Sequence, residues 1–251
     1  MKSTFKLSLL TVVLAGSAFL TNCSEDPINP IDNVSNTDFS AEEPFSYEFA
    51  ITDHSGLELR AVNGTITITQ LSGSNSLKIT GVKRVRSESN ADATAHLNDL
   101  MVETQDLAVG FLVRTVQPDF SGGRTYSVDY TITMPRNMDI IVISANGQVI
   151  LDDIHGSVFV NLINGDIDSK VTLPADGIID MQLTNGSMAL DIPQNTSTTF
   201  TAKVGNGSIT VTDLELQNRL ETAKSLTGTL GDGRGTISLN AANGTITVMG
   251  F

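Results

Sequence analysis

Apolar residues recur at fixed distances from six Asn-Gly pairs along the chain. Counted from the Asn, positions −6, −4, −2, +3 and +5 are apolar in every copy, except at Ser144 and Ser169. Steps of two residues place side chains on one face of a strand, so each run predicts a strand with one buried face. The six pairs are Asn63 and Gly64, Asn146 and Gly147, Asn164 and Gly165, Asn185 and Gly186, Asn206 and Gly207, and Asn243 and Gly244.

Each Asn-Gly pair predicts a sharp turn between two such strands. Gly adopts positive φ without steric cost, and Asn tolerates it better than most residues. Both flanking apolar faces can then point toward one core. We therefore interpret the twelve residues as structural turns rather than as a repeated active site.

Two architectures fit these turns. If each Asn-Gly joins a hairpin, the chain forms an antiparallel β meander or sandwich. If each is the corner of a coil, successive coils stack as parallel strands, and spacings of 18, 21 and 21 residues suit such coils. Stacking also explains the nearly constant turn sequence, because like residues lie above like. The favoured prediction is an all-β, single-domain parallel β-helix, or solenoid, of stacked coils with Asn-Gly corners.

The remaining segments interrupt this repeat, and an irregular insertion is expected at about residues 75–125. Residues 75–87, 110–118 and 126–135 are predicted strands, 90–106 a short helix, and 118–124 a loop. A second interruption at 216–235 is expected to lengthen the coil between Asn206 and Asn243. The only basic cluster lies on the first of these strands and is interpreted as a solvated face; it consists of Lys78, Lys83, Arg84 and Arg86.

The N-terminus has the pattern of a secretory signal peptide, predicted at residues 1–22. A basic start precedes an apolar run at 7–20, which is short for a membrane span. Cys23, the only cysteine, follows directly, and residues 20–23 resemble a bacterial lipobox with Asn22 at a position where a small residue is usual. Lipidation of Cys23 is therefore expected. Residues 23–44 predict a lipidated, flexible tether, and residues 45–251 the repeat domain.

Composition and charge narrow the range of partners. The chain of 251 residues has a net charge of −13, which argues against binding nucleic acid through electrostatics. Aromatic residues make up 5%, Trp is absent and Gly numbers 21, a composition of strands and tight turns.

Little in the sequence indicates catalysis or cofactor binding. His54, His96 and His155 share no metal-ligand spacing, and no catalytic residue or cofactor is predicted. Acids that follow two of the corners are weak calcium candidates, and acids on an outer face also motivate a polysaccharide-active enzyme as the least favoured alternative. These acids are Asp152, Asp153, Asp166 and Asp168. Asn-x-Ser/Thr matches at the corners are interpreted as turn chemistry rather than glycan acceptors.

Several units of the chain resemble a known bacterial family. They are "NGDIDSKV", "NGSMALDI", "GNGSITVTDL" and "NGTITVMGF", with the segments at 126–158 and 228–248. They resemble the putative-adhesin family of β-strand-repeat proteins, a domain of unknown function similar to the auto-transporter adhesin head domain. The resemblance implies a β-helix-like domain on secreted or lipid-anchored proteins. It transfers no catalytic residue, because the family has none established.

Together these features predict a cell-envelope lipoprotein with a non-enzymatic, adhesin-like role at the cell surface. The expected location is the bacterial outer membrane, reached through the lipid anchor, with an extracellular glycan or protein as partner. A periplasmic scaffold or envelope-stress sensor is the alternative. Because Phe251 lies within the last predicted strand, the final coil is expected to expose an edge that either another segment covers or a partner uses.

Overall fold

The chain folds almost entirely into β-strands in this computed structural model, which describes residues 38–51 and 54–251. One short helix, α1 (Asn90–Ala95), and a 3₁₀ turn, η1 (Leu97–Asp99), interrupt the strands. The strands are β1 (Phe39–Ala50), β2 (Gly56–Arg60), β3 (Asn63–Leu71), β4 (Ser76–Ser87), β5 (Met101–Leu107), β6 (Gly110–Val116), β7 (Thr125–Pro135), β8 (Asp139–His155), β9 (Val158–Thr172), β10 (Ile178–Ile192), β11 (Thr198–Thr212), β12 (Gln217–Glu221), β13 (Ser225–Leu230) and β14 (Gly235–Gly250).

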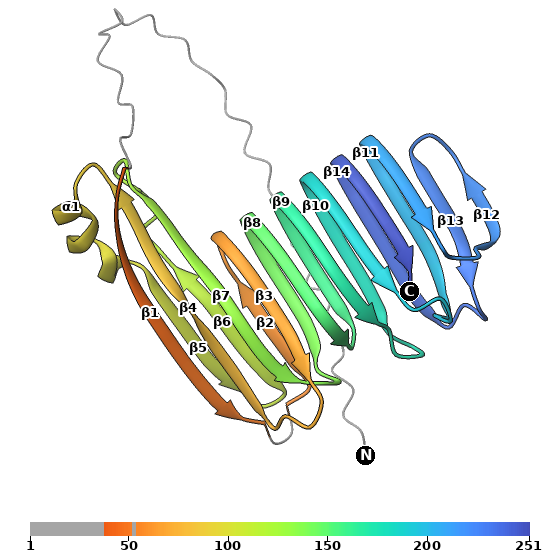
Figure 1. Ribbon diagram of the computed structural model, residues 1–251, viewed down its shortest axis with the longest axis horizontal. Helices are drawn as coiled ribbons and strands as arrows, with labels where there is room; N and C mark the ends of the chain where they lie inside the picture. The colour runs from red at the N-terminus through yellow and green to blue at the C-terminus, as the bar shows by residue number, and fades with distance from the viewer. Residues whose placement is uncertain (1–37, 52–53) are drawn as a thin grey trace, which may run out of the picture.

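The five longest repeat strands, β8 to β11 and β14, each run through an Asn-Gly corner. They pair in parallel and in one register on both sides of the corner, so that Ile179 lies beside Val158 and Met188 beside Ile167. The open sheet thus folds into two facing layers (Figure 1). We call the strand halves before the corners the first layer and those after them the second layer. The predicted parallel solenoid is confirmed, and the antiparallel meander is wrong.

One hydrophobic core lies between the two layers. The repeat positions are buried in every coil except at Ala61, Ile209 and Val211, which are half-buried and pack against the same core. The polar exception Ser169 is buried too, and its hydroxyl donates to the carbonyl of Ala189 at 2.8 Å. Each coil therefore contributes apolar side chains from both halves, as the period of two residues predicts.

The coils do not stack in chain order. The last strand, β14, lies between β10 and β11, so the end of the stack is β11 rather than the strand that precedes Phe251. Residues 216–235 do not simply lengthen a coil: they include β12 and β13, which extend the first layer beyond β11. Of the two outcomes expected for the edge of the final strand, coverage by another segment is the one observed, because β11 pairs with β14. β11 and β14 carry similar apolar rows, so the hydrophobic pattern alone does not distinguish the two orders.

Toward the N-terminal end, each layer continues with different strands. The first layer adds β2, β6 and β5 to β8, and the second adds β3, β7, β4 and β1. The strands predicted at 75–87, 110–118 and 126–135 are confirmed as β4, β6 and β7. The helix predicted at 90–106 is correct only for its first turns. Residues 101–107 form β5 instead, because they pair antiparallel with β6 across a tight turn.

β1 begins at Phe39, inside the segment predicted to be a tether up to residue 44. Its first half is mostly exposed, so no hydrophobic pattern marks it. It is held by antiparallel pairing with β4, where Glu43 contacts Lys83 at 2.7 Å and Glu42 contacts Arg84 at 2.7 Å. Opposite charges on directly paired strands stabilise such a pair. The basic cluster therefore faces acids of β1 as well as solvent.

The predictions for the extreme N-terminus lie outside the described residues. They comprise the signal peptide at 1–22, the lipidation of Cys23 and most of the tether. In the part of the chain that the structure describes, no helix has the length and apolar character needed to cross a membrane.

Candidate functional surface

The six corner asparagines form one continuous ladder of side chains along the corners of the stacked coils. Beyond the first coil, each side-chain amide donates to the side-chain oxygen of the Asn in the preceding coil of the stack. From Asn146 to Asn63 the distance is 2.7 Å, and from Asn206 to Asn243 it is 2.9 Å. The ladder starts at Asn63, whose amide donates to the carbonyl of Tyr126. Its order is Asn63, Asn146, Asn164, Asn185, Asn243 and Asn206.

The corner glycines stack as closely as the asparagines. Gly165 has φ of +135°, and a Cβ built on it would lie 1.7 Å from the carbonyl oxygen of Gly147. Gly207 makes the same approach to Gly244, at 1.6 Å. Positive φ was expected from the sequence, but the close backbone approach was not. Both requirements exclude any side chain here.

The outward positions of the second layer form polar rows across the strands. On β3 and β14 these positions hold Thr65, Thr67, Thr245 and Thr247, which lie in register with the corresponding positions of the coils between them. Two residues after the corner Asn, the outward position is polar in every coil, whereas four residues after it Ile150 and Ala189 interrupt the polar row. The central strands carry charge on the same outer face. Asp166 and Asp168 of β9 lie in these two rows. The next row, six residues after the corner Asn, holds Asp152 of β8, Lys170 of β9 and Asp191 of β10.

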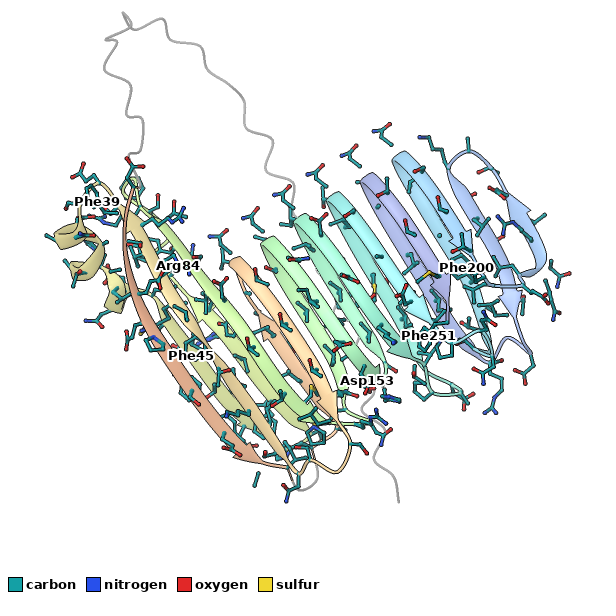
Figure 2. All side chains as sticks on the ribbon, viewed as in Figure 1. Phe39, Phe45, Arg84, Asp153, Phe200 and Phe251 are labelled. Carbon is teal, nitrogen blue, oxygen red and sulfur yellow. The ribbon has the colours of Figure 1, made fainter. Side chains whose placement is uncertain are left out.

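The four calcium candidates do not gather into one group. Asp166 accepts hydrogen bonds from the backbone and hydroxyl of Ser187, and Asp168 lies two residues further along the same outer face. Asp153, labelled in Figure 2 near the lower end of β8, has φ of +51° at an irregularity in the pairing of β8 with β9. Among the described residues, no group of three or more His, Cys, Asp or Glu side chains could hold a metal ion.

Local contacts account for the shifted acidities of these carboxyls. The Arg136 guanidinium hydrogen-bonds Asp153 and lowers the pKa of that carboxyl, and His155 adds a weaker contribution in the same direction. Asp191 shifts the other way: burial raises its pKa most, and neighbouring Asp168 raises it further. Asp153 is therefore held ionised by a neighbouring cation, whereas the charged form of Asp191 is disfavoured.

The three histidines are each engaged by carboxylates. His54 contacts Asp106 at 2.8 Å, and His96 contacts Asp99 at 2.7 Å, while His155 contacts the Asp153 side chain. Within the described residues, none of these rings is hydrogen-bonded to a hydroxyl that could act as a nucleophile. A depression of about 220 Å³ lies over β5 and β6, smaller than typical ligand pockets. It is lined by Glu103, Thr104, Gln105, Leu112 and Arg114.

These features define a two-layer β-solenoid with a polar corner rim. The family model described as Toastrack DUF4097 matches residues 124–249. The chain therefore belongs to the Toastrack DUF4097 family of β-repeat domains, in agreement with the resemblance to the putative-adhesin group.

Solved structures from Clostridium sporogenes and Bacteroides fragilis are similar to the chain to different degrees. A protein of Clostridium sporogenes described as a putative cell adhesion protein is 14% identical, with a TM-score of 0.52 over 83% of this chain and 100% of that one. This similarity concerns the fold alone. A putative adhesin of Bacteroides fragilis is 11% identical over 83% of this chain and 97% of that chain, with a TM-score of 0.26. No curated protein matches the chain.

Proposed function

We propose that the protein is a cell-envelope lipoprotein whose solenoid has a non-enzymatic, adhesin-like role. The observation that carries the proposal is the outer face of the second layer, where hydroxyl and carboxylate groups stand in register over several stacked strands. Such a face offers many weak polar contacts to an extended glycan or protein partner. Membership of the Toastrack family, with its fold similarity to a described cell adhesion protein, supports the same role.

The proposed anchor is an acyl group on Cys23, with the following residues as a spacer. The support for it is the apolar run that precedes this sole cysteine. A single chain anchors only marginally, so full lipoprotein acylation is expected. The solenoid would then stand off the outer membrane with its outer faces accessible.

The anchor is tested by fractionating cells that express the wild type or Cys23→Ser. The wild type is expected in the membrane fraction and the variant in the soluble fraction. Recovery of both in the membrane fraction would contradict the anchor. Protease treatment of intact cells then separates two locations: digestion supports the surface role, and protection favours a periplasmic scaffold or stress sensor.

The binding face is tested with cells that display matched variants. Thr247→Arg adds a bulky cation to the outer row of the second layer, and Gln182→Arg adds the same group to the exposed outer face of the first layer. Attachment to immobilised matrix glycans and proteins should fall several-fold with the first variant and stay near the wild-type level with the second. Equal attachment of all three, or no attachment by the wild type, would remove the support for this face.

A further inference from the structure

The two layers end at different strands at the β11 end of the stack. In the first layer, residues 198–203 of β11 pair with β13, which in turn pairs with β12. In the second layer, residues 206–212 of β11 pair with β14 on one side, and no other described strand pairs with them. Backbone groups on that side of β11 are therefore open to another strand. Figure 1 shows β13 and β12 at this end of the molecule.

The core beneath this edge is incomplete. Ile209 and Val211 occupy the two inward positions after the corner and are half-buried. In the other five coils, the inward residues three and five positions after the Asn are at most 1% exposed. The difference arises because each of those coils has a neighbour on both sides in the second layer. One further strand would complete the burial of Ile209 and Val211.

The open edge of β11 matches an edge that already binds a strand. β14 presents Asn243-Gly-Thr-Ile-Thr-Val and holds β11 in register from Asn243 to Met249. β11 presents Asn206-Gly-Ser-Ile-Thr-Val on its open side. Among the described residues, no hydrogen bond reaches the side-chain oxygen of Asn206, and no glycine lies against the Gly207 carbonyl. The Asn ladder and the Gly stack both end with a group ready to accept the next coil.

Natural edge strands are usually protected by charge, proline or a bulge. Residues 206–212 contain neither a charged residue nor a proline, and their pairing with β14 has no irregularity. The opposite edge of the second layer, β1, carries Pro44 and several glutamates. Of the two edges of the second layer, the unprotected one is therefore that of β11.

We propose that the second-layer edge of β11 is a binding site for one parallel β-strand supplied by another polypeptide. The strand carries an Asn-Gly corner followed by Ser or Thr and alternating apolar residues. Its Asn donates to the side-chain oxygen of Asn206, and its Gly lies against the Gly207 carbonyl. Its inward apolar side chains cover Ile209 and Val211. The main chain provides affinity and the corner provides specificity, as in other strand-addition complexes.

A second copy of this chain fits the site less well. Its other corner strands already have two neighbours, and its β11 presents a second acceptor edge rather than a donor. If the β11 strands of two copies pair edge to edge with their apolar faces on the same side, the two strands must run antiparallel. The two Asn206 side chains then lie apart. The expected partner is therefore a different polypeptide that carries the same Asn-Gly repeat and whose first coil has an unpaired strand edge.

The experiment uses the full chain in detergent and a labelled peptide with the sequence of residues 240–250, followed by fluorescence anisotropy. Saturable binding is expected, and the peptide with the Gly244→Val change should bind at least tenfold more weakly. In the protein, Ile209→Lys places an inward charge on the edge and should weaken binding at least tenfold. The matched variant Thr210→Lys points outward on the same strand and should bind within twofold of wild type.

Hydrogen exchange locates the bound peptide on the protein. Peptide-induced protection is expected at residues 206–212. Protection lost from 235–250 would mean exchange with β14, which overturns the proposal. So would absence of peptide binding, equal effects of the two lysine variants, or self-association of the chain through this edge. The two peptides provide a test that does not depend on the folding of any protein variant.

Discussion

The two ends of the solenoid are finished in different ways. At the N-terminal end, both layers finish in antiparallel strands, and α1 lies against β1 and β4. Aromatic rings fill the space there, with Phe45 against Tyr130 at 5.7 Å and Phe49 against Phe111 at 5.2 Å between ring centroids. At the β11 end, only the first layer is extended. Phe200 lies in the core of that end in Figure 2, while the second layer stops at an unpaired strand.

This difference shows that capping and stacking have separate physical origins. The coils stack because small corners and apolar rows repeat, and any coil can receive another. The N-terminal end stops the stack with residues that do not repeat: Tyr side chains, charged pairs and a short helix. Arg124, for example, hydrogen-bonds Asp92 of α1 and lowers the pKa of that carboxyl to about 2. Mutations should therefore act differently in the coils and at the two ends.

The largest effect is expected at a corner in the middle of the stack. Gly165→Ala should lose more than about 4 kcal/mol of unfolding free energy, because its Cβ overlaps the carbonyl of Gly147. Gly73→Ala, in a turn of the N-terminal region, has φ of +76° but no atom within 4 Å of the added Cβ. It should cost about 1 kcal/mol. Urea denaturation measures both, and similar losses would show that corner stacking is not the constraint.

The next largest loss of unfolding free energy is expected at an isoleucine three residues after the corner Asn, a position that can be compared between an inner coil and the edge coil. Ile167→Ala, in a fully surrounded coil, should cost about 3 kcal/mol through lost burial and a cavity. Ile209→Ala, in the half-buried copy on β11, should cost about 1 kcal/mol. The measurement is again the urea midpoint at constant slope. A loss at Ile209 as large as that at Ile167 would mean that the edge is covered in solution.

Alkaline pH should act on the N-terminal end, where all three tyrosines lie. Burial raises the pKa of Tyr130 to about 12, although the hydrogen bond with Thr115 opposes this shift. The unfolded chain ionises near pH 10, so stability present below pH 10 is lost as pH rises toward 12, by roughly 2 kcal/mol. Tyr130→Phe should remove most of this loss. An unchanged slope of stability between pH 10 and 12 in the variant would refute the assignment.

The smallest difference in stability is expected between two asparagines of the corner ladder, one inside it and one at its end. Asn164→Ala removes two side-chain hydrogen bonds, one to Asn146 and one from Asn185, and should cost about 1.5 kcal/mol. Asn206→Ala, at the end of the ladder, removes one and should cost about half as much. Thermal unfolding of the pair resolves the difference. A larger loss at Asn206 would indicate that its side-chain oxygen already has a partner.

The sequence predicted the structure of the repeated coils well and the structure of the segments outside the repeat poorly. Positions around each Asn-Gly predicted the strands, the buried rows and the bend, because burial imposes a period of two. The place of β14 was missed, since Ile209 and Ile246 stand at equivalent positions and either strand suits either neighbour. The start of β1 was missed because Glu42 and Glu43 are held by cross-strand partners rather than by burial.

For the candidate surface, the sequence placed acids on an outer face but did not give their arrangement. Asp152 and Asp166 lie on that face, as their positions after two corners indicated, whereas Asp153 is turned aside at an irregularity that no local signal marks. The Asn ladder is implicit in six identical turn residues on stacked coils. The backbone conformation of Asn-Gly does not reveal it, because the ladder depends on the Asn side chain.

The difference between the two ends is tested most directly by hydrogen exchange of the unliganded chain, resolved to single amides. Residues 187–191 of β10 and 208–212 of β11 occupy equivalent positions after the corner. All amides of the β10 segment should be strongly protected. In the β11 segment, alternate amides should exchange many times faster, because their N–H groups face no strand. Equal protection of the two segments would contradict the account.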